Sequence, residues 1–185
     1  AAKIWNIDVE AVEWENGALM HHRRMTRPAN SAAVVLTIPG GVLQETATNR
    51  GVTTVASLAG ATSRLDSLQI RDAMVGKKAS LALRAGGDSL TLTIEGSPQD
   101  LEAALKLAHA LLRHAPVEET AFDKWQQQIL QGIARARVDL QAQFRIAVQR
   151  AQLGDDARFR ELTEEDVEAR SIAEAEAWLR SIVDG

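Results

Sequence analysis

A strand pattern in the middle of the sequence constrains the fold more than any other feature. In residues 89–95 three apolar residues alternate with polar ones, which is the period-2 pattern of a half-buried strand. A second predicted strand, 79–85, precedes it, and Gly86-Gly87-Asp88 between them is typical of a tight turn. Strands joined by so short a connection pair antiparallel, so the chain needs an antiparallel sheet with one covered face.

Further strands are predicted nearer the N-terminus. Residues 7–12 alternate in the same way, and Asn16-Gly17 predicts a hairpin turn with 18–25 as the return strand. Arg27-Pro28-Ala29-Asn30 is predicted to end that strand. Residues 32–38 (AAVVLTI) form a continuous apolar run before Pro39-Gly40-Gly41. Such a run is expected of a strand that is covered on both faces or central in its sheet.

The rest of the chain shows mainly helical spacing. Two short helices are predicted between the strands, one with Asn49 as its N-terminal cap and one over 67–74. After residue 96, helices are predicted from Ser97 to Pro116, from Val117 towards Gln149 as one long helix, and from Ser171 onward. Thr163 and Asp166 resemble a capping box, with aspartate in place of glutamate. This order predicts an α+β fold, a mainly antiparallel sheet with helices packed on one face.

Composition excludes several classes of partner and chemistry. The 185 residues suffice for one domain, and a net charge of −4 comes from interleaved acidic and basic residues without a basic stripe. Nucleic acid is therefore not expected as a partner. No apolar run is long enough to span a bilayer, so no membrane partner is expected. The absence of cysteine excludes thiolate metal sites and cysteine nucleophiles.

An ordered set of short motifs resembles a known family, the M16 (pitrilysin/insulinase-like) zinc metallopeptidases. The motifs extend over nearly the whole chain. No single motif is specific, and the resemblance depends on their order along the sequence. They include residues 14–18, 38–42 with Glu45, 49–52, 65–78, 92–101 and 155–162 followed by Thr163. The resemblance implies that residues 1–185 form a single M16 metallopeptidase domain. This domain is expected to be part of a longer multidomain chain, and its final strand is expected to lie beyond residue 185.

The resemblance also implies where a zinc site would lie. Active members carry H-x-x-E-H on their first helix and a distant glutamate ligand on the long helix. Alignment at Gly51-Val52 places the two histidine positions on Thr54 and Leu58, the base on Ser57 and the third ligand near Gly132. Threonine and serine are poor zinc ligands, and leucine and glycine offer none. We therefore expect no catalytic residue, metal ligand or cofactor-binding residue in this chain.

The resemblance further implies a function without hydrolysis by the chain itself. Active members pair a metal-bearing half with a degenerate half that closes a chamber, so this chain is expected to form chamber wall and to bind peptide. Zinc and endopeptidase activity are expected in a partner domain of the full-length protein. The expected partners are other M16-like domains of the same chain or a paired subunit, with peptide substrate possible. The bacterial periplasm or cytoplasm is the expected location, and a non-enzymatic interaction or scaffold module is the alternative.

A third hypothesis, an independent metalloenzyme, would have to use the four histidines. His21 and His22 are adjacent on a predicted strand and so point to opposite faces. His109 and His114 are about 140° apart around a helix, since each residue turns ~100°. Neither pair converges on one ion, which makes this the weakest hypothesis.

Four arginines lie along the predicted long helix, at positions 135, 137, 145 and 150. The simplest interpretation is a solvated helix face. The alternative is a surface that binds an acidic partner.

Overall fold

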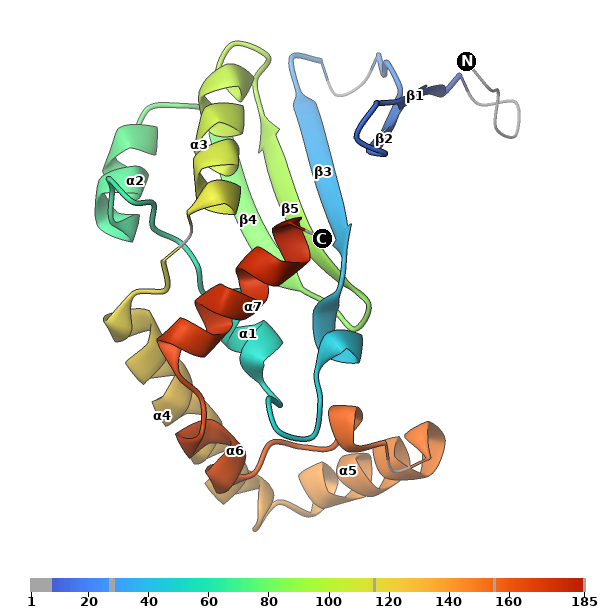
Figure 1. Cartoon of the computed structure of the whole chain (residues 1–185), viewed down its shortest axis with the longest axis vertical. Coiled ribbons are helices and arrows are strands. Elements are labelled where there is room, and N and C mark those ends of the chain that lie inside the picture. The colour runs from blue at the N-terminus through green and yellow to red at the C-terminus, as the bar shows by residue number, and fades with distance from the viewer. Residues whose placement is uncertain (1–7, 27–28, 115, 155, 185) are drawn as a thin grey trace. The chain divides into compact units, whose positions relative to one another are not determined.

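The computed structural model describes residues 8–26, 29–114, 116–154 and 156–184 (Figure 1). The predicted start of the first strand at Ile7, the predicted break at Arg27-Pro28, and Asp155 of the 155–162 motif lie outside these residues. The chain divides into two compact units, 1–31 and 32–185, which are described separately.

The first unit contains the predicted hairpin. β1 (Glu10–Glu13) pairs antiparallel with β2 (Leu19–His22). Gly17 at the turn has φ 81°, the left-handed conformation that glycine adopts without strain. Its N–H donates to the Trp14 carbonyl at 2.8 Å. The hairpin is confirmed, with strands shorter than predicted.

The second unit is built on a three-stranded antiparallel sheet. Its strands are β3 (Ala32–Pro39), β4 (Ala79–Ala85) and β5 (Ser89–Gly96), in the order β3-β5-β4. The alternating apolar residues of β5 are each at most 2% exposed, which confirms the predicted half-buried strand.

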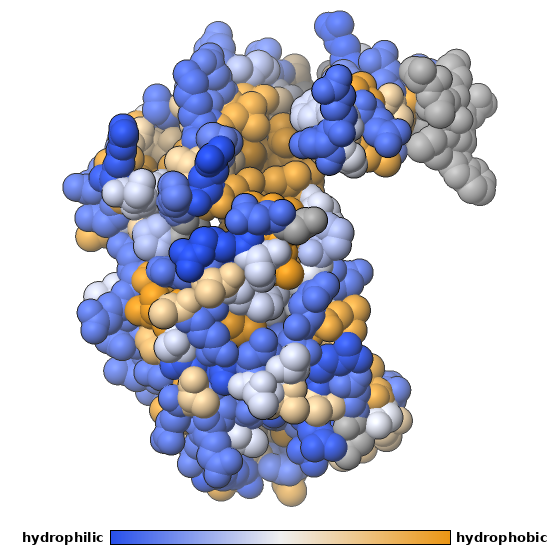
Figure 2. Space-filling model, in the orientation of Figure 1, coloured by the Kyte–Doolittle hydropathy of each residue, from blue (hydrophilic) through white to orange (hydrophobic). Residues whose placement is uncertain are grey.

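The prediction for residues 32–38 is wrong, because β3 lies at an edge of this sheet and pairs only with β5 among the described strands. Val35 is 60% exposed and Leu36 is 40% exposed. Figure 2 shows apolar surface on the sheet beside α3. A continuous apolar run indicates a strand but does not by itself give its place in the sheet.

Helices cover one face of the sheet, as predicted. Figure 1 shows α3 (Leu101–Arg113) and α7 (Ile172–Asp184) lying across the same face. Ala104 and Ala108 of α3 pack against the middle of β5. Leu179 of α7 and Val55 of α1 (Val52–Ala56) pack around Leu90. The α+β fold class is confirmed.

The single long helix predicted from Val117 towards Gln149 is wrong. Two helices occupy this part of the chain, α4 (Glu119–Ala136) and α5 (Leu140–Leu153). The Asp139 carboxylate accepts from the N–H groups of Gln141 and Ala142, at 2.9 and 3.3 Å, and so starts a new helix. The helical spacing of apolar residues continues across the break. For this reason the spacing alone does not indicate that Asp139 begins a second helix.

The remaining elements are short. They are η1 (Gly41–Gln44), α2 (Ser67–Met74), η2 (Ala157–Phe159) and α6 (Glu164–Glu168). The predicted capping box of Thr163 and Asp166 is present at α6. The predicted cap at Asn49 is wrong, because α1 begins after Gly51 and the Asn49 side chain accepts from Thr46 N–H instead. In the described part of the chain, no helix is long and apolar enough to cross a bilayer.

Candidate functional site: the α1 region and the β4 edge

A buried carboxylate holds the start of α1. Glu45 is 6% exposed, and its two oxygens accept from Gly51 N–H at 3.0 Å and Thr53 N–H at 2.9 Å. α1 has only five residues, so almost all its N–H groups lack a partner within the helix. Glu45 therefore satisfies the donors that would otherwise be buried without an acceptor.

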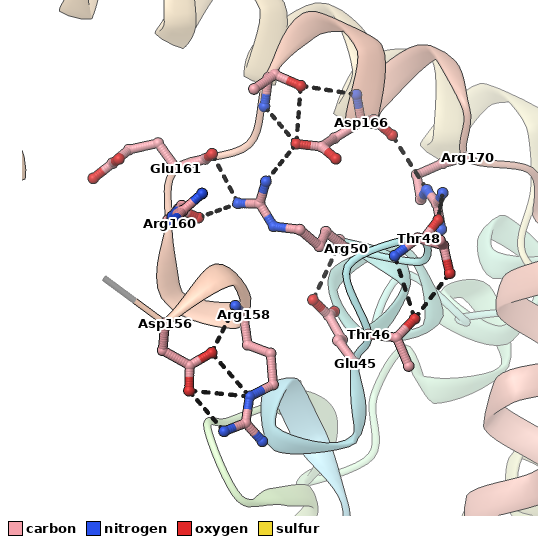
Figure 3. Close-up of polar contacts among 12 residues, drawn as sticks. Glu45, Thr46, Thr48, Arg50, Asp156, Arg158, Arg160, Glu161, Asp166 and Arg170 are labelled. Atoms are coloured by element: carbon pink, nitrogen blue, oxygen red, sulfur yellow. Dashed lines mark hydrogen bonds and ion pairs between the residues drawn. The ribbon is translucent and has the colours of Figure 1, made fainter. Parts of the chain in front are cut away.

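Two buried arginines tie the loop before α1 to the segment around α6 (Figure 3). Arg50, 7% exposed, donates to Asp166 Oδ2 at 2.7 Å, to the Glu161 carbonyl at 2.8 Å and to the Arg160 carbonyl. Arg170, also 7% exposed, donates to Glu174 at 2.7 Å and to the Thr48 carbonyl at 2.6 Å.

Nearer the surface, Arg158 of η2 connects η2 to η1. Its guanidinium donates to Asp156 Oδ2 at 2.7 Å and to the Leu43 carbonyl at 3.2 Å. The hydrogen bonds from the Arg158 side chain and backbone lower the pKa of Asp156 from 3.8 to about 2. These groups hold α1 in position, and no local sequence pattern predicts this role for Arg50, Arg158 or Arg170.

The positions that correspond to H-x-x-E-H lie at and beyond the end of α1. Thr54 is exposed on the helix, whereas Ser57 follows the last helical residue and donates through Oγ to the Thr54 carbonyl at 2.7 Å. Leu58 is half-buried and packs against the core. The helix is too short to carry all three positions, contrary to the expectation of one helix bearing the motif.

Gly132 lies in a different place. It is within α4 and lines a cleft of about 500 Å³ between α4 and α5. Ser57 and Leu58 line a cavity of about 420 Å³ beside β4, and the two linings have no residue in common. Ser57 and Leu58 thus line one cavity, and Gly132 lines another. The described residues contain no group of three His, Cys, Asp or Glu side chains that could hold a metal ion, the histidines included.

The edge of β4 is open beside the first cavity, which we call the β4 cavity. Ser97 N–H donates to the Lys78 carbonyl at 2.7 Å, and Gly86 N–H donates to the Ser89 carbonyl at 2.8 Å. In an antiparallel pair bonded and non-bonded residues alternate, so residues 80, 82 and 84 face β5. Residues 79, 81, 83 and 85 consequently direct their N–H and C=O groups away from β5. No described strand pairs with β4 on that side.

The β4 cavity provides mostly apolar walls beside this edge. Leu81 and Leu83 of β4 line it, together with Met74 of α2 and Leu107 and Leu111 of α3. An open strand edge can add an extended peptide, whose alternate side chains then enter adjacent pockets. The arrangement thus offers backbone hydrogen bonds and an apolar pocket, and it offers no group able to activate water.

Comparisons with known proteins place this geometry in a fold family. No protein-family model and no curated protein matches the sequence. Among solved structures, the periplasmic protease PqqL from Escherichia coli is similar over 94% of this chain and 19% of its own, with a TM-score of 0.80 and 16% identity. The ferredoxin protease FusC, solved as a mutant with Arabidopsis ferredoxin, is similar over 99% of this chain and 21% of its own, with a TM-score of 0.81 and 13% identity.

A third similar solved structure is described as an inactive domain. A peptidase M16 inactive domain from Pseudomonas fluorescens is similar over 93% of this chain and 43% of its own, with a TM-score of 0.78 and 16% identity. This chain thus spans about a fifth of PqqL and of FusC, and less than half of the inactive-domain chain. With its antiparallel sheet and covering helices, the chain has the fold of the M16 peptidase domains.

Proposed function

We propose that this chain is a non-catalytic M16-type domain that contributes to a substrate-enclosing chamber and binds peptide along the open edge of β4. The observation that carries the proposal is the β4 cavity, where an unpaired strand edge lies beside apolar walls. The positions of a zinc site near that cavity hold Thr54, Ser57 and Leu58, none of which supplies the ligands or the base that hydrolysis needs.

Hydrolysis and its zinc then belong to another M16-like domain, in the same chain or in a paired subunit. Proteins with a similar domain support this division, because PqqL and FusC are named as proteases and are about five times as long as the matched segment. The bacterial periplasm or cytoplasm fits the proposal, and PqqL is described as periplasmic.

The test uses extended peptides with an N-methyl group at every second residue. Methylation removes N–H donors and blocks strand pairing on one side of the peptide only. Titration into isotope-labelled protein should shift the amide signals of residues 79–85. Two peptides are compared, one methylated at the odd-numbered residues and one at the even-numbered residues. One of them should cause no shifts, and the other should cause the same shifts as the unmethylated peptide. Equal binding of both methylated peptides, or shifts confined to residues outside 79–85, would contradict peptide addition at β4.

A scaffold module without any peptide-binding role is the second candidate. It is favoured by large apolar side chains that α5 exposes, among them Leu140 at 86% and Phe144 at 73%. Such residues are typical of surfaces that contact another protein. Absence of all peptide binding, together with stable association with another M16-like domain, would support the scaffold. Stoichiometric zinc in the purified chain, measured by elemental analysis, would contradict both candidates.

A further inference from the structure

The cleft between α4 and α5, called here the α4–α5 cleft, contains a glycine that the fold does not require. Gly132 is in the interior of α4, where glycine is less favourable than alanine by about 1 kcal/mol. Its φ is not positive, and a Cβ built on it would meet no atom within 4 Å. Neither backbone conformation nor close packing therefore accounts for this glycine. Its effect is to leave open space over the floor of the cleft.

That floor is apolar and is shared by three segments of the chain. Ile129 and Ile133 of α4, Ile146 of α5 and Leu162 before α6 line it, and each is only partly buried. The volume of about 500 Å³ is large enough for branched apolar side chains. An apolar ligand group would complete the burial of these residues.

The rim of the cleft is basic, although the chain as a whole is acidic with a net charge of −4. Three arginines and a single glutamate line it. Arg137 pairs with Glu164 at 2.8 Å and Arg150 pairs with Glu161 at 3.2 Å. Arg145 is exposed and makes no ion pair within the part of the chain that the structure describes. α5 itself contains no acidic residue, so a carboxylate approaching Arg145 meets no like charge on that helix.

We propose that the α4–α5 cleft is a docking site for an acidic segment of a partner protein. The segment inserts a branched apolar side chain over Gly132 and sets a carboxylate against Arg145. Charge complementarity selects this partner, because a basic rim around an apolar floor favours a segment that carries both acidic and apolar groups. The site is separate from the β4 cavity and does not depend on peptide addition there.

The test measures binding of a defined probe by fluorescence anisotropy. The probe is a fluorescein-labelled peptide of about 14 residues with leucines at helix spacing among glutamates. Arg145→Glu and Gly132→Leu should each weaken its binding by at least about tenfold, since the first reverses the charge and the second fills the cleft. Arg135→Glu and Ala134→Leu are the matched controls, because both residues are exposed on α4 and neither lines the cleft. Both controls should bind as the parent does.

Three further arms complete the test. Replacing glutamates with lysines in the probe should abolish binding, and raising the salt concentration should weaken it. Shifted amide signals on titration should map to residues 129–150. No binding of the acidic probe at millimolar concentration, or equal binding by all four variants, would overturn the proposal. It would also be overturned if anionic phosphatidylglycerol vesicles, rather than the peptide, bound in a way that Arg145→Glu abolished.

Discussion

Arginine side chains have opposite environments in two parts of the molecule. One part is the α1 region, which we define as α1 with the loop before it and the segment around α6 that contacts it. The other part is the α4–α5 cleft. In the α1 region Arg50 and Arg170 are each 7% exposed, and each joins segments more than a hundred residues apart in the sequence. In the cleft Arg145 is exposed and has no ion-pair partner within the described residues. Arginine therefore has a structural role in the first setting, where buried guanidiniums hold the loop before α1 to the segment around α6. In the second setting the exposed Arg145 is the residue on which the proposed docking site depends.

The largest expected effect is that of removing Arg50. Arg50→Ala removes the buried guanidinium that pairs with Asp166 and donates to the Glu161 carbonyl, and it should lower the free energy of unfolding by about 3–5 kcal/mol. Chemical denaturation measures the change. Arg145→Ala is the matched control from the cleft, and its effect should stay within about 0.5 kcal/mol. A similar decrease in the free energy of unfolding for both variants would contradict the contrast between the buried and the exposed arginine.

Glu45→Ala tests the same region through its acceptor. The substitution leaves Gly51 N–H and Thr53 N–H buried without an acceptor and should cost about 1–3 kcal/mol. Hydrogen exchange of these two amides should speed up more than exchange in α3. Unchanged exchange at residues 51 and 53 would show that Glu45 does not hold α1.

Gly132→Ala tests whether the fold requires the glycine in the α4–α5 cleft. Because a Cβ there meets no atom within 4 Å, the substitution should stabilise the protein by about 1 kcal/mol through helix propensity. Ala134→Gly, at an exposed position on the same helix, should destabilise it by a similar amount. A destabilising Gly132→Ala would mean that the fold needs this glycine, which would remove the argument for an open cleft.

The smallest expected effect concerns pH. The folded-state pKa of Asp156 is about 2, below its ordinary 3.8, because Arg158 donates to the ionised carboxylate. A lowered pKa stabilises the fold above about pH 4, and this contribution disappears as the pH falls towards 2. The difference in melting temperature between the parent and Asp156→Asn should therefore shrink between pH 5 and pH 2. A constant difference over this range would contradict the assigned cause.

Much of the fold could be predicted from local pattern. The alternation in 89–95, the Asn16-Gly17 turn and the Thr163–Asp166 capping box each depend on neighbouring residues, and each is present. The edge position of β3 and the break at Asp139 could not be predicted from apolar spacing. Spacing does not record which strands pair, and a capping residue can interrupt a helix without interrupting the apolar period.

The candidate site was harder to predict than the fold. The assignment of Thr54, Ser57, Leu58 and Gly132 to the positions of a zinc site comes from the resemblance alone, and it stays a prediction. The open edge of β4 and its cavity depend on strand order, which only the three-dimensional arrangement supplies. The contacts of Arg50 and Arg170 join distant segments, so no local pattern marks them.

The span of the Arg50–Asp166 contact has a consequence for how the chain folds. The two residues are separated by 116 positions, and Val55 of α1 packs with Leu179 of α7 near the end of the sequence. Contacts of such high sequence separation form slowly, because a long loop must close before they contribute. During synthesis, α1 therefore stays without its buried partners until the segment around α6 and α7 has emerged. We therefore expect the packing of α1 to be completed only after α6 and α7 are available.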